Sequence, residues 1–437
     1  MAESDLNRDS VPTPEVSDNT ACAGESAGKK QRTRRIPPLL IVIPLAALLT
    51  VAVILIIYFT TRDGTDEVRA TLYANGLLAV EIEVNENGES VTRWGYVGKD
   101  GSFVIEAKFL AADSFADNGL AAVKTRDGWG YINKNGELVI AAQYKDAGAF
   151  GEYNYAAVKL GDSWGYIRKD GTPVVNPQFD MAYSFTDKGL ALVKIGEKYG
   201  YINRAGAYVI VPRFEDARSF RADGTAQVKE FGKWGVINTK GEYTINPQFD
   251  EISTVSSCGL TRVMTDGKYG YIEKSGVYAI NPTYTFAKDF AANGLALVEK
   301  DGEYGFINKK NELVLSGFAG ADSFGAGGLA PIQEKKGGAW EYIDRTGKVV
   351  FENIFVEANA YSFGLALVKD RDGKWLFLNE KGQGIITCPE NCRQALPFYE
   401  DGFTFLITAD AESEMLYYTL INKKGEVLLD RIVNFRY

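Results

Sequence analysis

The sequence predicts an all-β repeat protein whose repeats follow a single N-terminal transmembrane helix. An aromatic residue recurs about every 35 residues over most of the chain, and a glycine follows seven residues after nearly every one of them. One long apolar stretch without charge lies near the N-terminus. A fixed period of about 20–50 residues is typical of repeat arrays, in which each unit buries its apolar face only against its neighbours.

Ten aromatic residues divide the array into units. The first seven follow one another at intervals of 35 residues, and the last three follow after 36, 35 and 43 residues. We interpret their rings as structural core of the repeat, because a buried ring stabilises by about 3–5 kcal/mol relative to alanine. We call them the anchor aromatics, and they are Trp94, Trp129, Trp164, Tyr199, Trp234, Tyr269, Tyr304, Trp340, Trp375 and Tyr418.

Two further aromatic columns and one turn position accompany the anchors. Rings recur fifteen and twenty-one residues after the anchor, and one unit has Val255 in the second of these columns. The turn position, seven residues after the anchor, is glycine except at Asn311. Asparagine tolerates the left-handed backbone best after glycine, so we expect φ > 0 there. That some rings are stacking platforms for sugar or peptide stays open, above all for the out-of-register Tyr153 and Tyr361.

Each unit is predicted to be a β-meander. Between Gly189 and Ile210, short runs of alternating apolar residues are separated by turns that contain Gly, Asn and Lys. These are strand and hairpin signals. The segment that leads to the next unit holds a fourth short strand or a loop. Ten units exceed the roughly four to eight blades typical of a β-propeller, so we expect an open β-solenoid or superhelix, with a closed β-propeller as the alternative.

The N-terminal part is predicted to anchor the chain in a membrane. Residues 36–61 contain no charged residue, and about 20 apolar residues suffice to span a bilayer as a helix. Basic residues are concentrated in 29–35, so residues 1–35 are expected to be a disordered cytoplasmic tail. Residues 62–71 are then a linker, and residues 72–437 the extracytoplasmic repeat domain. A cleaved signal peptide is disfavoured, because the stretch is long and no small-residue cleavage site follows it.

Composition argues against catalysis. The chain has no histidine and a formal net charge of −9, which excludes histidine-based triads and disfavours nucleic acid as a partner. Asp146, Asp180, Asp216 and Asp250 recur at nearly the same repeat position. We therefore interpret them as turn or surface residues rather than a catalytic pair of carboxylates. We expect no enzyme activity, and no catalytic, cofactor-binding or metal-binding residues.

Two cysteines mark an insertion in the ninth unit. Cys388 and Cys392 bracket Pro-Glu-Asn, and oxidation is possible outside the membrane. A local disulfide between them and a pair of free thiols are both open. Two cysteines without a histidine make a poor zinc site.

The repeat resembles the bacterial WG (KWG) repeat family. The resemblance is carried by Asp127-Gly-Trp-Gly-Tyr-Ile-Asn-Lys-Asn-Gly-Glu-Leu-Val-Ile and by Lys233-Trp-Gly-Val-Ile-Asn-Thr-Lys-Gly-Glu-Tyr-Thr-Ile-Asn-Pro-Gln-Phe-Asp, and it covers essentially residues 72–437. The sequence departs from the pattern at Glu341, Leu376 and Thr419, where the glycine after the anchor is absent. The resemblance implies a bacterial cell-surface or secreted protein with a binding or scaffolding role, and it brings no catalytic residues to this chain.

Taken together, the sequence predicts a single-pass cell-membrane protein with a cytoplasmic N-terminus and extracytoplasmic repeats. Many similar weak sites on one chain gain avidity. We therefore expect it to bind cell-envelope glycan or a surface protein, without a cofactor. The alternative is a ligand-sensing or assembly subunit of a membrane signalling complex.

Overall fold

The computed structural model describes residues 72–256, 258–413 and 415–436. The chain divides into two compact units, residues 1–57 and 58–437, and every described residue lies in the second. The predicted tail, transmembrane helix and linker at 1–35, 36–61 and 62–71 lie outside the described residues. Within the described part of the chain, no helix is long and apolar enough to cross a membrane.

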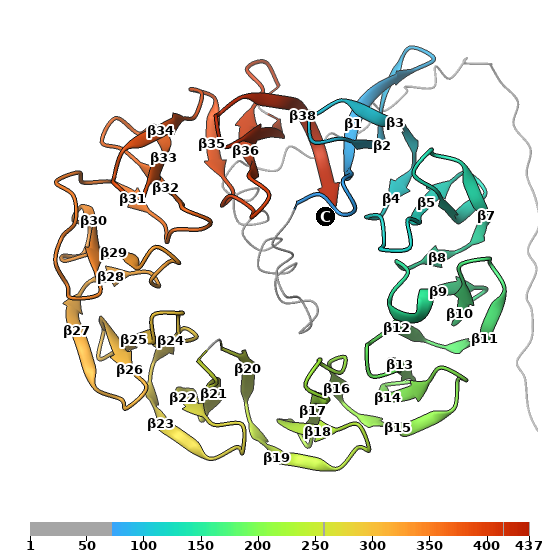
Figure 1. The fold of residues 1–437 in the computed structure, drawn as a ribbon, viewed down its shortest axis with the longest axis horizontal. Coiled ribbons are helices and arrows are strands. Elements are labelled where there is room, and N and C mark those ends of the chain that lie inside the picture. Colours follow the sequence, from blue (N-terminus) through green and yellow to red (C-terminus); the bar gives the residue numbers. More distant parts are fainter. Residues whose placement is uncertain (1–71, 257, 414, 437) are drawn as a thin grey trace, which may run out of the picture. The chain divides into compact units, whose positions relative to one another are not determined.

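The second unit consists of small antiparallel sheets, which we call blades, that follow one another around a ring (Figure 1). In each blade the strands are hydrogen-bonded in chain order, so each is a meander as predicted. The short first strand faces the middle of the ring, and the last strand lies on the outer rim (Figure 1). A 3-10 helix, η1 (Glu152–Asn154), precedes β9. The blades between the two ends of the chain comprise β4 (Ala111–Ala112), β5 (Ala121–Thr125), β6 (Gly128–Ile132) and β7 (Leu138–Tyr144); β8 (Asp146–Ala147), β9 (Tyr155–Leu160), β10 (Ser163–Arg168) and β11 (Pro173–Phe179); β12 (Met181–Phe185), β13 (Leu190–Ile195), β14 (Lys198–Asn203) and β15 (Tyr208–Phe214); β16 (Asp216–Ala217), β17 (Thr225–Glu230), β18 (Lys233–Asn238) and β19 (Tyr243–Phe249); β20 (Glu251–Val255), β21 (Thr261–Thr265), β22 (Lys268–Ile272) and β23 (Tyr278–Tyr284); β24 (Phe286–Ala287), β25 (Leu295–Lys300), β26 (Glu303–Asn308) and β27 (Leu313–Phe318); β28 (Gly320–Ala321), β29 (Leu329–Gln333) and β30 (Trp340–Asp344); and β31 (Glu357–Ala358), β32 (Leu365–Lys369), β33 (Trp375–Asn379) and β34 (Gly384–Thr387).

The two ends of the array share one sheet. Its strand order is β3-β2-β1-β38-β37-β36-β35. The first half of β38 pairs with β37, as an outer strand does, and its last residues pair with β1, as an inner strand does. The strands are β1 (Leu78–Glu86), β2 (Glu89–Val97), β3 (Phe103–Phe109), β35 (Cys392–Ala395), β36 (Phe403–Ala409), β37 (Leu416–Asn422) and β38 (Val427–Arg436).

This shared sheet decides between the two predicted arrays. Val80 of β1 is the register partner of Phe435 of β38, and Ala79 is the partner of Arg436. The last strand therefore supplies the inner strand of the first blade, and the array returns to its start. The expectation of an open solenoid is wrong for the described residues, and the closed, propeller-type alternative matches the pairing. The unit count misled because four to eight blades is the typical range for propellers and does not limit how many four-stranded units can close.

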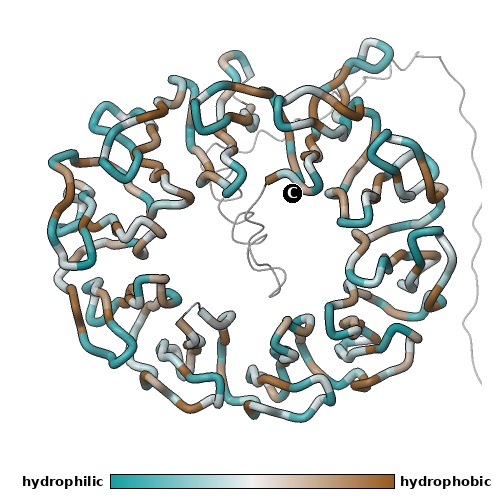
Figure 2. Tube along the Cα trace, in the orientation of Figure 1, coloured by the Kyte–Doolittle hydropathy of each residue, from teal (hydrophilic) through white to brown (hydrophobic). Residues whose placement is uncertain are grey.

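The recurrent glycines are turn residues. Hydrophobic residues are concentrated in the strands, and hydrophilic residues are concentrated in the turns that connect them (Figure 2). Gly171 and Gly206 at the turn position have φ of +83° and +81°, and Asn311 has φ of +64°. The predicted left-handed conformation is confirmed, including at the position where asparagine replaces glycine.

The glycine directly after the anchor aromatic is required for a different reason, the close approach of a neighbouring strand. A Cβ atom on Gly165 would lie 2.5 Å from the carbonyl oxygen of Val175 and 2.7 Å from the nitrogen of Pro177. The outer strand bulges toward the anchor strand here, since the register shifts between Trp164 and Tyr166. Only glycine admits so close an approach of the neighbouring backbone.

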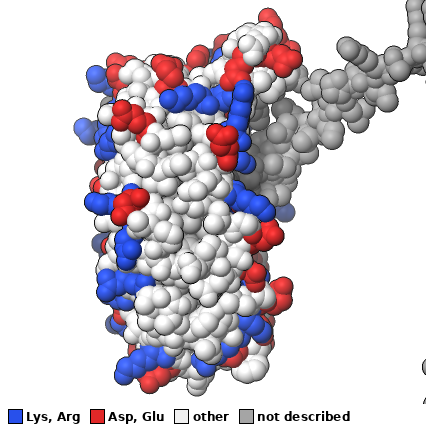
Figure 3. Space-filling model, turned by 90° about the vertical axis from the view of Figure 1, so that its right-hand side faces the viewer, with Lys and Arg blue, Asp and Glu red and all other residues white. Residues whose placement is uncertain are grey.

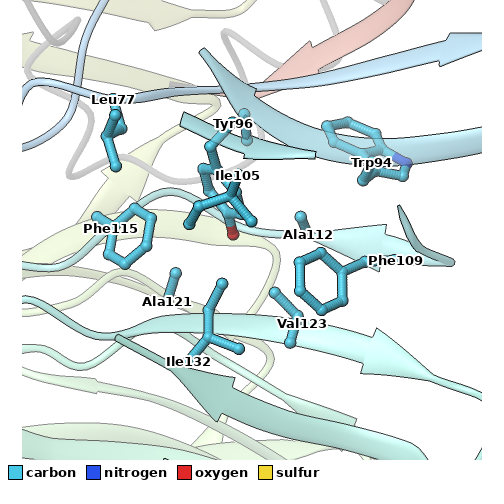
Figure 4. Close-up of a cluster of buried hydrophobic side chains, with 11 residues drawn as sticks. Leu77, Trp94, Tyr96, Ile105, Phe109, Ala112, Phe115, Ala121, Val123 and Ile132 are labelled. Atoms are coloured by element: carbon cyan, nitrogen blue, oxygen red, sulfur yellow. The ribbon is translucent and has the colours of Figure 1, made fainter. Parts of the chain in front are cut away.

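The core lies between neighbouring blades. One cluster joins residues of β1 to β3 with residues of β4 to β6, among them Tyr96 and Phe115 (Figure 4). Both predicted aromatic columns are buried: Phe179 and Phe214 of the first are 0% exposed, and Phe185 of the second is 2% exposed. Each blade thus buries its apolar faces against its neighbours, as a repeat array requires.

Candidate functional site

The anchor aromatics lie at the margin of the core rather than in its centre. Trp94 and Trp375 are buried, and the other eight anchors are half-buried. A ring that the sequence reasoning passed over, the tyrosine two residues after the anchor, is as deeply buried as the aromatic columns. Its signal was present, because it recurs with the same 35-residue period. The fully buried members are Tyr96, Tyr131, Tyr166, Tyr201, Tyr271 and Tyr342.

At six positions this tyrosine ties its blade to the next, and we call the contact the tyrosine bridge. The hydroxyl of Tyr166 donates a hydrogen bond of 2.8 Å to the carbonyl oxygen of Tyr183, seventeen residues further along the chain. The rings of Tyr166 and Phe185 lie with their centroids 4.9 Å apart. Burial raises the pKa of the Tyr166 hydroxyl far above its usual value. The same hydrogen bond is made by Tyr96, Tyr131, Tyr201, Tyr271 and Tyr342.

The recurrent acids hold turns, as predicted. Oδ2 of Asp180 accepts from the amide of Gly196 at 2.6 Å, and Oδ2 of Asp250 accepts from the amide of Asp266 at 2.7 Å. Asp250 also pairs with Lys233, and these hydrogen bonds hold the pKa of its carboxyl below the usual range. Asp146 and Asp216 accept from the amides that follow them.

The tyrosine bridge is absent where the sequence has Val236, Phe306, Phe377 or Leu420 at this position. At the first of these, between blades β16–β19 and β20–β23, another hydrogen bond takes its place. The sequence has Val236 at the tyrosine position of this interface. The carbonyl oxygen that the hydroxyl would reach, that of Ser253, instead accepts a hydrogen bond of 2.7 Å from Nε2 of Gln227. Gln227 is the register partner of Val236, whereas in the preceding blade Leu192 faces Tyr201. The glutamine is 3% exposed and replaces the missing donor.

The replacement of tyrosine by Val236 leaves a cavity between the two blades. Its volume is about 80 Å³. The side chains of Val236, Ile245, Ile252 and Ile272 give it an apolar part, and it is also lined by Gln227, Thr244 and Thr261 and by the charged residues Arg221, Asp223, Glu273 and Lys274. We call it the interblade cavity.

Arg221 is one of the residues that line this cavity, and its guanidinium has one unused donor. One terminal nitrogen of its guanidinium donates to Oγ1 of Thr225 at 3.1 Å. Its Nε is buried without a hydrogen-bond partner, and the nearest carboxylate oxygen of Asp223 lies 3.9 Å away, beyond hydrogen-bond distance. That oxygen accepts from the amide and hydroxyl of Thr225 at 3.0 and 2.6 Å. Burial opposes ionisation of Asp223, but the two Thr225 hydrogen bonds keep its pKa below the usual range.

A larger hollow lies at the ring closure. Its volume is about 260 Å³, and it is lined by residues of β36 to β38. Arg431, at a φ of +54°, crosses it. Its guanidinium contacts Asp410 at 2.7 Å and Glu83 at 3.6 Å and lies 4.6 Å from the centroid of the Tyr417 ring. These groups satisfy one another, and the contacts join the last blade to the first.

One aromatic ring stands out on the surface. Phe231 is 83% exposed, and its backbone has φ of +56°, at the tip of the β17–β18 hairpin. The same turn position holds Gly196, Asp266 and Asp301 in other blades, which suit a left-handed backbone. Phenylalanine there gains no burial and adopts a conformation rare for bulky side chains.

The other singled-out side chains occupy structural positions. Tyr361 is buried, and its hydroxyl donates to the carbonyl oxygen of Asn379 at 2.8 Å. Tyr153 remains half exposed, but Arg204 covers its ring at 4.5 Å from the centroid. Cys388 and Cys392 are buried free thiols, and the hydrogen bond between them together with burial raises the pKa of Cys388. The disulfide between them stays a prediction.

Comparison with solved structures gives low similarity. A crystal structure of the eukaryotic initiation factor aligns with a TM-score of 0.47 at 11% identity, over 83% of this chain and 97% of that one. BamB from Moraxella catarrhalis aligns with a TM-score of 0.31 at 11% identity, over 69% and 96%. Hsv2 from Kluyvelomyces marxianus aligns with a TM-score of 0.33 at 8% identity, over 57% and 95%. A search of curated proteins found no match.

Comparison with protein families gives a clear result. The family described as WG containing repeat matches residues 94–128, 129–163, 164–199, 199–234, 234–269, 269–304, 304–337 and 342–375. The matches begin at anchor aromatics in all but the last case and together cover more than half of the chain. The chain therefore belongs to the WG containing repeat family.

Proposed function

We propose that this protein is a membrane-anchored, extracytoplasmic binding or scaffold module for cell-envelope glycan or a surface protein. The observation that carries the proposal is Phe231, a ring that is exposed at the cost of an unfavourable backbone conformation. Such outliers persist where the surrounding structure or a function requires them. An exposed aromatic side chain is also typical of the residues that dominate binding surfaces.

The outer rim supports a binding role. On the side of the ring that carries β7 and β11, charged side chains gather along two margins and uncharged residues fill the band between them (Figure 3). Several outer strands expose apolar side chains near their starts, at Val104, Leu138, Val139, Val209 and Leu313. A surface that repeats from blade to blade offers several similar weak contacts, which gain affinity together.

The test is co-sedimentation of the full-length protein, in detergent, with purified cell-wall sacculi at low and high salt. Salt-resistant binding that Phe231→Asp weakens by roughly 30-fold, equivalent to about 2 kcal/mol, is expected for a central aromatic contact. Gly196→Asp is the matched control, because it adds the same charge at the same turn position of another blade. Aspartate is tolerated there, as Asp266 and Asp301 show.

The two arms of the proposal separate in this experiment. Binding to sacculi identifies glycan as the partner. If sacculi do not bind, cross-linking on intact cells should capture a surface protein with the native chain and not with Phe231→Asp. Failure of both, or equal behaviour of Phe231→Asp and Gly196→Asp, contradicts the proposal.

A second candidate function is a ligand-sensing or assembly subunit of a membrane signalling complex. The interblade cavity favours it, because a hollow between two blades is a place where a small molecule can alter how they pack. In this case residues 1–28 should contact a cytoplasmic partner. Deleting them should abolish the cellular response while leaving ligand binding by the ring unchanged, and an unchanged response rules this candidate out.

A further inference from the structure

We propose that the interblade cavity binds the carboxylate end of a small aliphatic molecule, such as a free amino acid with a short aliphatic side chain or the C-terminal residue of a peptide. The inference goes beyond the surface contact proposed for Phe231, which is not among the residues that line the cavity.

At the cavity, other side chains replace the hydrogen bond that the missing tyrosine would make between the two blades. Replacing a tyrosine by Val236 removes ring volume, which alone would leave the carbonyl oxygen of Ser253 without its donor. Gln227, the residue opposite Val236, supplies that donor at 2.7 Å. Its own side-chain oxygen accepts from Arg218, which also contacts the carbonyl oxygen of Ile252 at 3.3 Å. The blade junction thus keeps its hydrogen bonds while the space of the ring stays free.

The charged part of the cavity is suited to a carboxylate. Nε of Arg221 is a buried charged donor without an acceptor, and a buried donor in that state is unfavourable until a partner arrives. A carboxylate is the partner whose geometry fits a guanidinium edge. Lys274 of the neighbouring blade lies 4.0 Å from Asp223, so its ammonium offsets the negative charge of that residue.

The apolar part limits the size of the ligand. Val236, Ile245, Ile252 and Ile272 present only hydrocarbon to the cavity. Its volume of about 80 Å³ is about half that of the roughly 150 Å³ cavity that admits benzene. A hydrocarbon chain of about three carbons fits this space, as in butyrate or the side chain of valine, and a sugar ring or a nucleotide does not.

The test uses the full-length protein in detergent with butyrate, L-valine, the dipeptide glycyl-valine and n-butylamine as probes, followed by ligand-detected NMR. Butyrate is expected to bind and butylamine, which has the same chain and the opposite charge, is not. L-Valine and glycyl-valine distinguish the two sources, because the longer dipeptide binds only if the cavity opens far enough for a peptide. Binding of butylamine as strong as that of butyrate, or no binding of any probe, overturns the proposal.

Two variants locate the site. Val236→Tyr introduces the residue that six other blades have at this position, fills the cavity and is expected to abolish binding. Phe306→Tyr is its control, since it places the same residue at the same repeat position of another blade, where it adds only a hydroxyl. Arg221→Gln removes the charged donor and is expected to weaken butyrate binding tenfold or more. This second variant keeps the test decisive if Val236→Tyr does not fold.

Retained butyrate affinity in both folded variants shows that the probe binds elsewhere and contradicts the proposal. Sedimentation with sacculi is measured in parallel. Val236→Tyr should leave it unchanged, and Phe231→Asp should leave butyrate binding unchanged, so the failure of one proposal is distinguishable from the failure of the other.

Discussion

The hydroxyl of Tyr201 donates a hydrogen bond of 2.7 Å to the carbonyl oxygen of Arg218, which lies in the next blade. The Tyr201 ring packs at 4.7 Å from the ring of Phe220, again across the blade boundary. One side chain thus contributes both a polar and an apolar contact to the same junction. The same hydrogen bond recurs at six positions around the ring.

Tyr201→Phe is expected to destabilise the ring, because it keeps the ring contact and removes only the hydroxyl. The loss of one such hydrogen bond costs about 0.5–1.5 kcal/mol. Denaturant unfolding followed by circular dichroism measures it. The control is Tyr208→Phe, whose ring is 40% exposed and should change stability little. Equal effects of the two substitutions would show that the bridge contributes no stability of its own.

Gly165→Ala is expected to destabilise the protein more than an ordinary surface alanine. Its Cβ would lie 2.5 Å from the carbonyl oxygen of Val175, and forced overpacking costs about 1–3 kcal/mol. Gly148→Ala is the control, because its nearest contact would be 3.7 Å from the carbonyl oxygen of Ala157. Thermal unfolding compares the two variants, and a Gly165→Ala midpoint as high as that of Gly148→Ala would refute the close-approach explanation.

Ring closure can be tested by a cross-link. Glu81 and Asn434 are register partners of β1 and β38, and such partners lie about 4.5–5.5 Å apart at their Cα atoms, within reach of a disulfide. The double variant Glu81→Cys with Asn434→Cys should form a disulfide on mild oxidation. Peptide mass spectrometry after digestion identifies it. Glu81→Cys with Asn422→Cys is the control pair, since β37 does not pair with β1. Absence of the first cross-link, with both thiols reactive, would favour an open array.

Alkaline pH is expected to unfold the ring. Burial raises the pKa of the Tyr131, Tyr201 and Tyr342 hydroxyls well above their value of about 10 in an unfolded chain. For an acid with a raised folded pKa, the unfolded state loses its proton first, so the stabilisation is complete below about pH 10 and declines as pH rises above it. The chain has 24 tyrosines, and those with exposed rings can ionise in the folded protein. A further rise in tyrosinate absorbance, from the buried hydroxyls, should coincide with the loss of circular dichroism above pH 10. Ionisation of all the tyrosines without that loss would contradict buried hydroxyls.

Much of the repeat could be predicted because it is local. Asn311 indicated that the turn position has a left-handed backbone. The regular period of the two further aromatic columns indicated that their rings are buried. The tyrosine two residues after the anchor carried an equally regular signal. Its hydrogen bond could not be anticipated, because the carbonyl oxygen that it reaches lies in another blade.

The candidate site could not be predicted from the sequence. Val236 and Gln227 are nine residues apart and unremarkable singly. That Gln227 supplies the hydrogen bond that Val236 cannot make is evident only from the strand register, which places the two residues opposite each other. Phe231 likewise looks like one more aromatic residue until its hairpin shows that the ring has nothing to pack against.

The sequence by itself determined the family, the length of the repeat and the strands and turns within it, since these depend on residues close together in the chain. Closure was decided only by the tertiary structure. Whether Val80 meets Phe435 depends on the small rotation between successive blades, which accumulates around the ring and is set by packing at every junction. The interblade cavity follows from that same packing, at the junction where Val236 replaces the bridging tyrosine.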